Sequence, residues 1–132
     1  MEATAAKLPI RVLIADDHRL FAEALEAILS SDERIQVVGH ASDGVEAVDL
    51  SARLHPAVVL MDISMPVMDG IEAAQRIRDA DAGTCVLMLT GSNSRADVDR
   101  SREAGASGYV TKDRIASELV ATIVEVIQRR LP

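Results

Sequence analysis

Polar residues stand directly after four aliphatic runs of the chain. Near-continuous β-branched and aliphatic runs of this length are typical of strands buried on both faces, and therefore of a parallel sheet. The carboxyl ends of parallel strands open on one edge of the sheet, where ligands bind. We therefore expect three carboxylates, a hydroxyl and an ammonium to converge on one site. They belong to Asp16, Asp17, Asp62, Thr90 and Lys112.

Three carboxylates at one sheet edge favour a bound cation. A pair of like charges about 4 Å apart costs roughly 4 kcal/mol at an effective dielectric constant of about 20. A site of a few carboxylates with room for water suits Mg²⁺, whereas zinc favours Cys and His clusters. The chain has one cysteine, and its three histidines lie on different expected elements. We expect ordinary surface or helix-end roles for His18, His40 and His55.

The chemistry that fits this group of residues is phosphoryl transfer. Mg²⁺, an ammonium and a hydroxyl around one carboxylate form a clamp that neutralises the oxygens of a transferring phosphoryl group. Asp62 is the expected nucleophile because it ends a central strand, between the acidic pair and Lys112. Formation of an aspartyl phosphate is established carboxylate chemistry.

The elements that position these residues alternate regularly along the chain. Five apolar runs are the expected strands: residues 10–15, 35–39, 57–61, 85–89 and 107–111. The first expected helix has an apolar stripe: Leu20, Phe21, Ala24, Leu25, Ile28 and Leu29. Four more helices are expected, opened by Asp43, Asp69, Ser94 and Asp113 and ending near Leu54, Arg78, Gly105 and Arg129. Alternating βα units with right-handed crossovers predict an α/β, doubly wound, three-layer sandwich with a parallel sheet.

Composition limits the classes of function. A chain of 132 residues is long enough for one domain with a single buried core. The net charge is −7 and the basic residues are scattered, so the chain lacks the basic stripe that nucleic-acid binding needs. No apolar run reaches the roughly 18 residues of a membrane span, and no signal peptide is evident. Together with the single cysteine, these features predict a soluble cytoplasmic protein with no membrane contact.

The fourth expected helix differs from the others. Most of its residues between Arg95 and Glu103 are charged or small, and Val98 is its only large apolar side chain. With little apolar surface to bury, it should be the least stable helix of the domain. Two interpretations remain open: a solvated helix held by ion pairs, or an element that moves in a switch.

The motifs at these positions resemble the receiver domain of two-component response regulators. They are the acidic pair at 16–17, the sequence MDISMPVMDG at 61–70, Thr90, and YVTK at 109–112. The resemblance covers residues 9–129, with a tail at 1–8 and the start of a linker or C-terminal tail at 130–132. It implies a flavodoxin-like (βα)5 sheet of five strands in the order 2-1-3-4-5. Residues 104–109 and Asp113–Arg114 resemble the NarL/FixJ-like subfamily.

The resemblance also implies a metal site and a phosphoryl donor. Asp62 would accept a phosphoryl group from the phosphohistidine of a sensor histidine kinase. Asp17 and Asp62 would ligate Mg²⁺ directly, together with the backbone carbonyl of Ser64, and Asp16 would act largely through water. The protein would catalyse only its own phosphorylation and dephosphorylation.

Two further roles follow from the same resemblance. Thr90 would hydrogen-bond the phosphoryl oxygens, Lys112 would pair with them, and Tyr109 would be the switch aromatic that swings inward as Thr90 moves. One position departs from the family pattern, because Asp113 follows Lys112 where proline is common. A cis bond before a residue other than proline costs about 3 kcal/mol, so the isomer of that bond is left open.

Members of this subfamily usually carry a C-terminal helix-turn-helix, which would supply DNA binding. The chain stops at Leu131–Pro132, where a linker would begin, so it is expected to be either a stand-alone or an excised receiver. The expected partners are a sensor histidine kinase, a phosphorylation-dependent homodimer and, through the output domain, DNA. A stand-alone receiver would act by protein–protein interaction or in a phosphorelay.

Two other functions are compatible with parts of the pattern. Residues 90–94 superficially resemble a phosphate-cradling loop, as in a flavodoxin-like flavin binder. However, the acidic pair after the first strand would repel a phosphate. A phosphatase with an aspartyl-phosphate intermediate usually has a second Asp two residues after its nucleophile, where this chain has Ser64.

Overall fold

The computed structural model describes residues 9–91 and 95–130, and its five strands form one parallel sheet. The strand order β2-β1-β3-β4-β5 is the one expected from the sequence. Strand boundaries lie within two residues of the expected ones. The strands are β1 (Ile10–Ala15), β2 (Ile35–Ala41), β3 (Val58–Asp62), β4 (Cys85–Thr90) and β5 (Gly108–Thr111).

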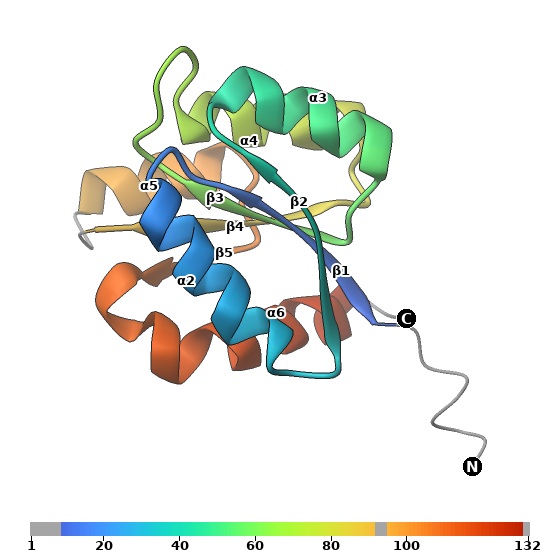
Figure 1. The fold of residues 1–132 in the computed structure, drawn as a ribbon. Helices are drawn as coiled ribbons and strands as arrows, with labels where there is room; N and C mark the ends of the chain where they lie inside the picture. The colour runs from blue at the N-terminus through green and yellow to red at the C-terminus, as the bar shows by residue number, and fades with distance from the viewer. Residues whose placement is uncertain (1–8, 92–94, 131–132) are drawn as a thin grey trace.

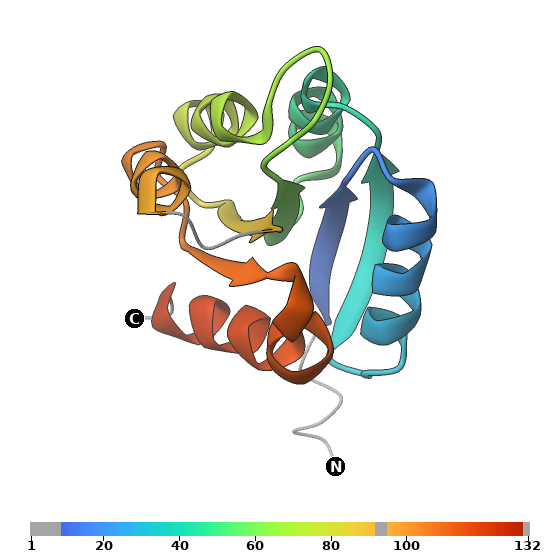
Figure 2. The ribbon, with the colours of Figure 1, turned by 90° about the vertical axis from the view of Figure 1, so that its left-hand side faces the viewer.

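The helices cover both faces of the sheet and make the three expected layers (Figures 1 and 2). α2 and α6 lie on one face, and α3, α4 and α5 lie on the other. The helices are α2 (Arg19–Ser30), α3 (Gly44–Leu54), α4 (Gly70–Ala80), α5 (Arg95–Glu103) and α6 (Ile115–Arg130), the last preceded by a 3₁₀ turn at Lys112–Arg114.

The buried core has two halves, one on each face of the sheet. Successive strand residues point to opposite faces. In β1, Ile14 therefore packs with α2 and α6, whereas its neighbour Leu13 packs with α3 and α4. In β3, Leu60 and Met61 divide in the same way. All four side chains are fully buried, as expected for strands covered on both faces.

The helix starts at α3 and α4 are confirmed by their capping bonds. The Asp43 carboxylate accepts a hydrogen bond from the Glu46 N–H at 2.8 Å, and the Asp69 carboxylate accepts one from the Glu72 N–H at 2.9 Å. The expected cap at Ser94 lies outside the described residues.

Two expectations about helix faces and ends were wrong. In α2, Leu20 is 82% exposed and Ala24 is exposed, because each lies two positions from buried Ala22 and therefore about 200° around the helix. The last helix does not begin at Asp113, which lies inside the 3₁₀ turn that leads into α6. Such turns are frequent at the starts of α-helices. The bond between Lys112 and Asp113 is trans.

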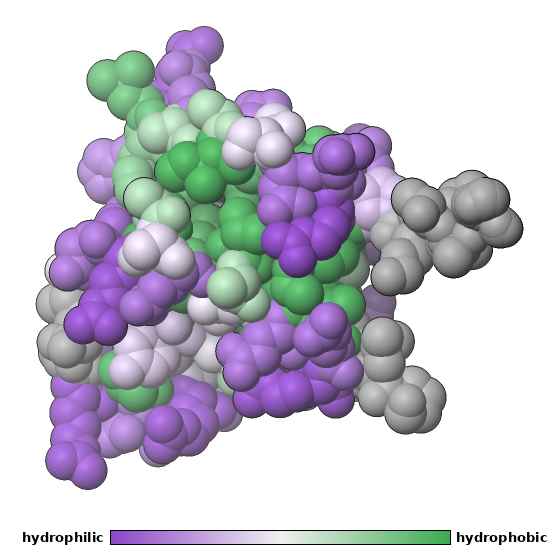
Figure 3. Space-filling view, turned by 90° about the horizontal axis from the view of Figure 1, so that it is seen from below, coloured by the Kyte–Doolittle hydropathy of each residue, from purple (hydrophilic) through white to green (hydrophobic). Residues whose placement is uncertain are grey.

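The surface differs between helices. In α5, Ser101 is the one buried residue among those described, which agrees with the small apolar surface of that helix. The face formed by α2 and α6 carries a hydrophobic band between hydrophilic borders (Figure 3). Partly buried hydrophobic residues of these two helices that pack against the core are Phe21, Ile28, Val120 and Ile127. No helix in the described ranges is both long enough and apolar enough to span a bilayer.

Candidate functional site

Two buried carboxylates meet at the carboxyl edge of the sheet. Asp16 directly follows β1, Asp62 ends β3, and these strands are hydrogen-bonded neighbours. The two residues are 4% and 3% exposed. Asp16 is held in place by two hydrogen bonds to neighbouring backbone groups. Its N–H donates to the Ala41 carbonyl at 3.0 Å, and its Oδ1 accepts from the His18 N–H at 2.8 Å. Both aspartates therefore lie at the sheet edge where the sequence predicted them.

Lys112 provides the positive charge of the site. Its Nζ lies 3.5 Å from Asp16 Oδ2 and 3.5 Å from Asp62 Oδ1, and its side chain is 26% exposed. The lysine follows β5, two strands away from β3 in the sheet, so its long side chain must reach across β4 to the carboxylates. One ammonium thus bridges two carboxylates, and the net charge of these three side chains is negative.

Burial and repulsion act together on Asp62. Loss of solvent raises the pKa of its carboxyl above the ordinary 3.8, and the neighbouring Asp16 charge raises it further. Lys112 and a hydrogen bond from the Ser64 N–H oppose this increase in the pKa. Oδ2 of Asp16 and Oδ2 of Asp62 are buried and accept no hydrogen bond from the described residues.

The remaining acidic residue faces outward. Asp17 follows Asp16, and its side chain is 32% exposed. Ligand atoms of Asp16, Asp17, His18 and Asp62 all lie within 4.8 Å of one another. A cavity of about 410 Å³ opens beside Asp16 and Asp17, between the start of α2 and the end of β2. Two buried oxygens without a hydrogen bond from the described residues, next to an open carboxylate, fit a hard divalent cation with oxygen ligands and water.

His18 is exposed and stands at the start of α2, as the sequence predicted, and it also belongs to this cluster. It occupies the N-cap position of α2, where its side chain makes no capping bond. Instead, its Nδ1 lies 3.3 Å from Asp16 Oδ1 and 3.4 Å from Asp17 Oδ1. The only indication of this role in the sequence is that His18 directly follows the acidic pair. The direction of its ring depends on how the chain turns into α2.

The other expected site residues lie around this centre. Thr90 ends β4 and is 4% exposed, in register with Thr111 of β5. Ser64 is exposed and follows Asp62 by two residues. Tyr109 of β5 is 42% exposed. The structure thus gathers the two buried aspartates and Lys112 within direct contact, with Thr90 on the strand beside Asp62 and Tyr109 on the outer side.

The loop after Asp62 is fixed at both ends. The Gly70 N–H donates to the Ile63 carbonyl at 2.9 Å, and a Cβ at Gly70 would collide with the Asp62 carbonyl. Only glycine allows this close approach of the start of α4 to the backbone of β3. Within the loop, the Met68 N–H donates to the Pro66 carbonyl at 2.7 Å, and Val67 between them has a φ of 70°. This is the rarer form of γ-turn, and it strains a β-branched residue.

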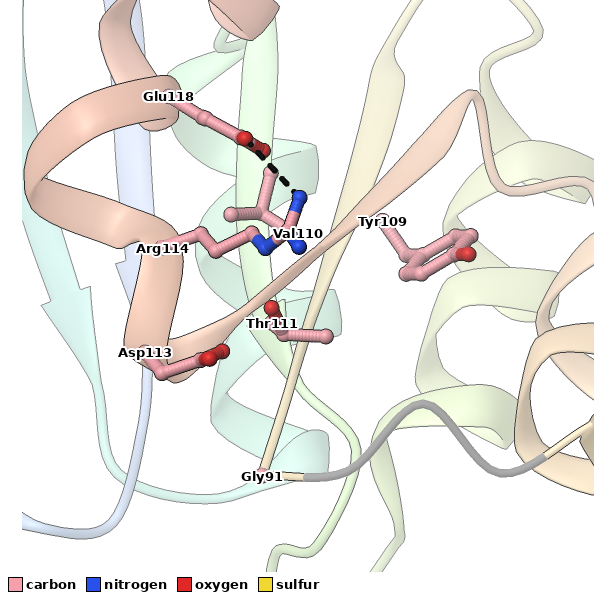
Figure 4. Close-up of a pocket in the computed structure, with 7 residues that line it drawn as sticks. All are labelled: Gly91, Tyr109, Val110, Thr111, Asp113, Arg114 and Glu118. Atoms are coloured by element: carbon pink, nitrogen blue, oxygen red, sulfur yellow. Dashed lines mark hydrogen bonds and ion pairs between the residues drawn. The ribbon is translucent and has the colours of Figure 1, made fainter.

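A second cavity is lined by residues of β5, the 3₁₀ turn and the start of α6 (Figure 4). Its volume is about 420 Å³. An ion pair between Arg114 and Glu118 closes one side at 3.3 Å, and the Tyr109 ring points away from that pair. The remaining lining residues are Gly91, Val110, Thr111 and Asp113.

We expect Asp62→Asn to stabilise the metal-free protein at pH 7. Asparagine keeps the shape of the side chain and removes a buried charge, while Lys112 keeps Asp16 as a partner. A gain of about 1 kcal/mol would raise the thermal midpoint of a domain of this size by about 3–5 °C. Asp79→Asn, which removes an exposed carboxylate of α4, is the control and should leave the midpoint unchanged.

The gain from Asp62→Asn should depend on pH. The folded wild type binds the Asp62 proton more tightly than the unfolded chain, because the pKa of Asp62 is raised above 3.8. The stability of the wild type therefore falls as pH rises from 3.8 to the raised pKa, and the loss is complete above that value. The difference in midpoint between wild type and variant should shrink as pH is lowered toward 4. A difference that stays constant from pH 8 to pH 4 would contradict this origin.

Comparisons with known proteins agree with the geometry. The family model of the response regulator receiver domain matches residues 12–124. The transcriptional regulatory protein LnrK of Bacillus subtilis is 37% identical over 117 residues, covering 89% of this chain and 53% of LnrK. The chemotaxis protein CheY of Halobacterium salinarum is 35% identical over 117 residues, covering 89% of this chain and 96% of CheY.

A solved structure has the same fold. The two-component response regulator of the LuxR family from Aurantimonas sp. SI85-9A1 superposes with a TM-score of 0.87 at 34% identity, covering 92% of this chain and 86% of that one. The chain spans about half the length of the transcriptional regulators that it matches.

Proposed function

The chain belongs to the response regulator receiver domain family, and from this premise we propose that it is a signalling switch phosphorylated on Asp62 by a sensor histidine kinase. One observation carries the proposal. The buried Asp62 carboxylate has the Lys112 ammonium 3.5 Å from one oxygen, while its other oxygen accepts no hydrogen bond from the described residues. This arrangement holds a nucleophile beside a cation that can receive phosphoryl oxygens.

In the proposed reaction, a carboxylate oxygen of Asp62 attacks the phosphorus atom of a phosphohistidine in line. The bond from phosphorus to the imidazole nitrogen breaks, and the histidine leaves with that electron pair. Lys112 pairs with an equatorial oxygen, and the Thr90 hydroxyl donates to another. The charge that builds up on these oxygens is larger than one ammonium can neutralise, so a second cation is needed.

The residues present fit Mg²⁺ as that second cation. Asp17, Asp62 and the Ser64 carbonyl would ligate it directly, and Asp16 would act through water. The support comes from the carboxylate oxygens of Asp16, Asp17 and Asp62, which lie within 4.8 Å of one another, and from the two buried carboxylate oxygens without a hydrogen-bond partner among the described residues. When bound, Mg²⁺ would neutralise phosphoryl oxygens and relieve the repulsion between the carboxylates.

We propose that the switch runs through Thr90 and Tyr109. A phosphoryl oxygen that bonds Thr90 would draw the loop after β4 toward Asp62, and the Tyr109 ring would follow inward. Tyr109 is 42% exposed and borders a cavity of about 420 Å³, so it has room to move. The energy available is about one charge-assisted hydrogen bond, roughly 1.5–3 kcal/mol. This energy shifts a two-state population by about ten- to a hundredfold.

The output belongs to the whole protein and is part of the proposal. Several relatives, LnrK among them, are transcriptional regulators about twice as long as this chain, which favours control of a DNA-binding output domain through phosphorylation-dependent self-association. The chemotaxis protein CheY is covered over 96% of its length, so the alternative for this chain is a stand-alone receiver that acts by protein–protein interaction or in a phosphorelay.

Hydrogen exchange with the phosphoryl mimic beryllofluoride and Mg²⁺ tests this function. We expect protection in two regions: the Asp62 pocket, because it binds the mimic, and residues 91–112, because the loop after β4 and strand β5 change state. Each additional hydrogen bond should slow local exchange by about ten- to a hundredfold.

Asp62→Asn is the matched control for this experiment, because it should lose both regions of protection. Protection of the Asp62 pocket with residues 91–112 unchanged would show that the switch does not use Thr90 and Tyr109. No protection anywhere in the wild type would contradict the receiver function itself.

A further inference from the structure

Lys112 has a third neighbour that the proposed chemistry does not use. The ring of Phe21, the third residue of α2, lies with its centroid 4.4 Å from the Lys112 Nζ. Phe21 is partly buried and packs against the core on the α2 and α6 side of the sheet. It is the only phenylalanine of the chain. The distance is within the range of a cation–π contact.

The ammonium is therefore held from two directions. Asp16 and Asp62 attract it from the sheet edge at 3.5 Å each, and the face of the Phe21 ring meets it at 4.4 Å. A lysine side chain has four rotatable bonds along its carbon stem, and it loses considerable rotamer freedom when it is fixed in one place. Carboxylates alone fix the charge but leave the stem free to approach from several directions, whereas a ring beside the ammonium restricts its path.

We propose that Phe21 is a positioning residue for Lys112. Its ring keeps the ammonium at the Asp16–Asp62 pair in the free protein, so that Lys112 meets an incoming phosphoryl oxygen without first searching rotamers. The inference rests on the proposed function of Lys112. Phe21 itself touches neither the phosphoryl group nor the metal.

The ring has two properties that an aliphatic side chain of similar size lacks. Its face carries the negative part of the quadrupole, which attracts an ammonium, and its flat surface covers the charge on that side. Leucine at position 21 would keep much of the apolar packing of α2 but would lose the attraction. Tyrosine would keep both properties of the ring.

The test compares Phe21→Leu, Phe21→Tyr and wild type by the rate of phosphorylation from acetyl phosphate at saturating Mg²⁺. We expect Phe21→Leu to be slower by about 2- to 30-fold, the range that matches the strength of a cation–π contact, and Phe21→Tyr to be close to wild type. Ile28→Val removes packing from the same helix without contacting Lys112, and it should also react at the wild-type rate. Phe21→Met replaces Phe21→Leu if the latter does not fold.

Two readouts separate positioning from a general structural effect. Mg²⁺ affinity should stay within about twofold in all variants, because Phe21 is not one of the predicted ligands and its proposed effect is on Lys112. In NMR spectra, the ε-methylene protons of Lys112 should show an upfield ring-current shift in wild type and Phe21→Tyr, and lose it in Phe21→Leu.

Phe21→Leu at the wild-type rate, or with its Mg²⁺ affinity reduced as much as its rate, would overturn the proposal. So would a Lys112 ε-methylene shift that is the same in wild type and Phe21→Leu. Failure of the proposed function would look different, because wild type and every variant would then remain unphosphorylated while the ring-current shift still reports the Phe21–Lys112 contact.

Discussion

Asp62→Asn should take up no phosphoryl group from acetyl phosphate and Mg²⁺, whereas the wild-type protein gains one. The amide has the shape of the carboxylate but lacks its nucleophilic charge. The residues around it remain in place, since Lys112 keeps its ion pair with Asp16 and the amide oxygen can still accept from the Ser64 N–H. The loss should be complete, and intact-mass spectra recorded after incubation would measure it.

The control for this experiment is Asp79→Asn, an exposed carboxylate of α4 whose removal changes the net charge equally. It should be labelled like the wild type. Equal labelling of Asp62→Asn and wild type would show that another residue carries the phosphoryl group, and it would contradict the assignment of Asp62 as the nucleophile. Because the same variant is expected to be at least as stable as the wild type at pH 7, loss of labelling cannot be attributed to unfolding.

The centre of the site was predictable because it depends on strand ends alone. Asp16, Asp62 and Lys112 follow apolar runs, and a parallel sheet brings the ends of those runs to one edge whatever the details of packing. The strand order adds that β1 and β3 are neighbours, which explains why the two aspartates are close in space. Sequence spacing and topology were therefore sufficient for these residues.

The surroundings of the site were not predictable in the same way, since they depend on helix phase and side-chain direction. The apolar stripe assigned to α2 included Leu20 and Phe21 alike, but Leu20 is 82% exposed and Phe21 packs on Lys112. These residues differ by 100° around the helix, and periodicity over one helix does not fix which edge of a stripe faces a particular lysine. His18 illustrates the same limit, because its ring direction follows from the turn into α2.

Loop geometry was a further limit. The sequence at 61–70 indicated a site by its resemblance to a family, yet nothing in it predicts the positive φ of Val67, since a β-branched residue disfavours that conformation. The conformation of Val67 is explained by Gly70, whose missing side chain allows α4 to start against the Asp62 backbone. The short connection between these two points then leaves a tight turn for Val67.

Asp17→Asn should bind Mg²⁺ at least 10- to 100-fold more weakly than the wild type, and at limiting Mg²⁺ its labelling should fall by a similar factor. Asp17 differs from Asp62 in its position: its side chain is 32% exposed, and the nitrogen 3.4 Å from its Oδ1 belongs to His18 rather than to Lys112. We therefore expect the loss of its charge to act mainly by weakening the binding of the cation. Calorimetric titration with Mg²⁺ measures the affinity, and removal of Mg²⁺ by a chelator should abolish labelling of every variant.

The two aspartates should then respond differently to excess metal. Saturating Mg²⁺ should restore most of the labelling of Asp17→Asn, because the weakened site is refilled, but none of that of Asp62→Asn, because the attacking group is absent. Glu23→Gln, an exposed carboxylate of α2 beside the same cavity, is the control and should bind Mg²⁺ like the wild type. Wild-type affinity in Asp17→Asn would place the cation elsewhere. Labelling that persists after chelation would mean that Lys112 alone neutralises the phosphoryl oxygens.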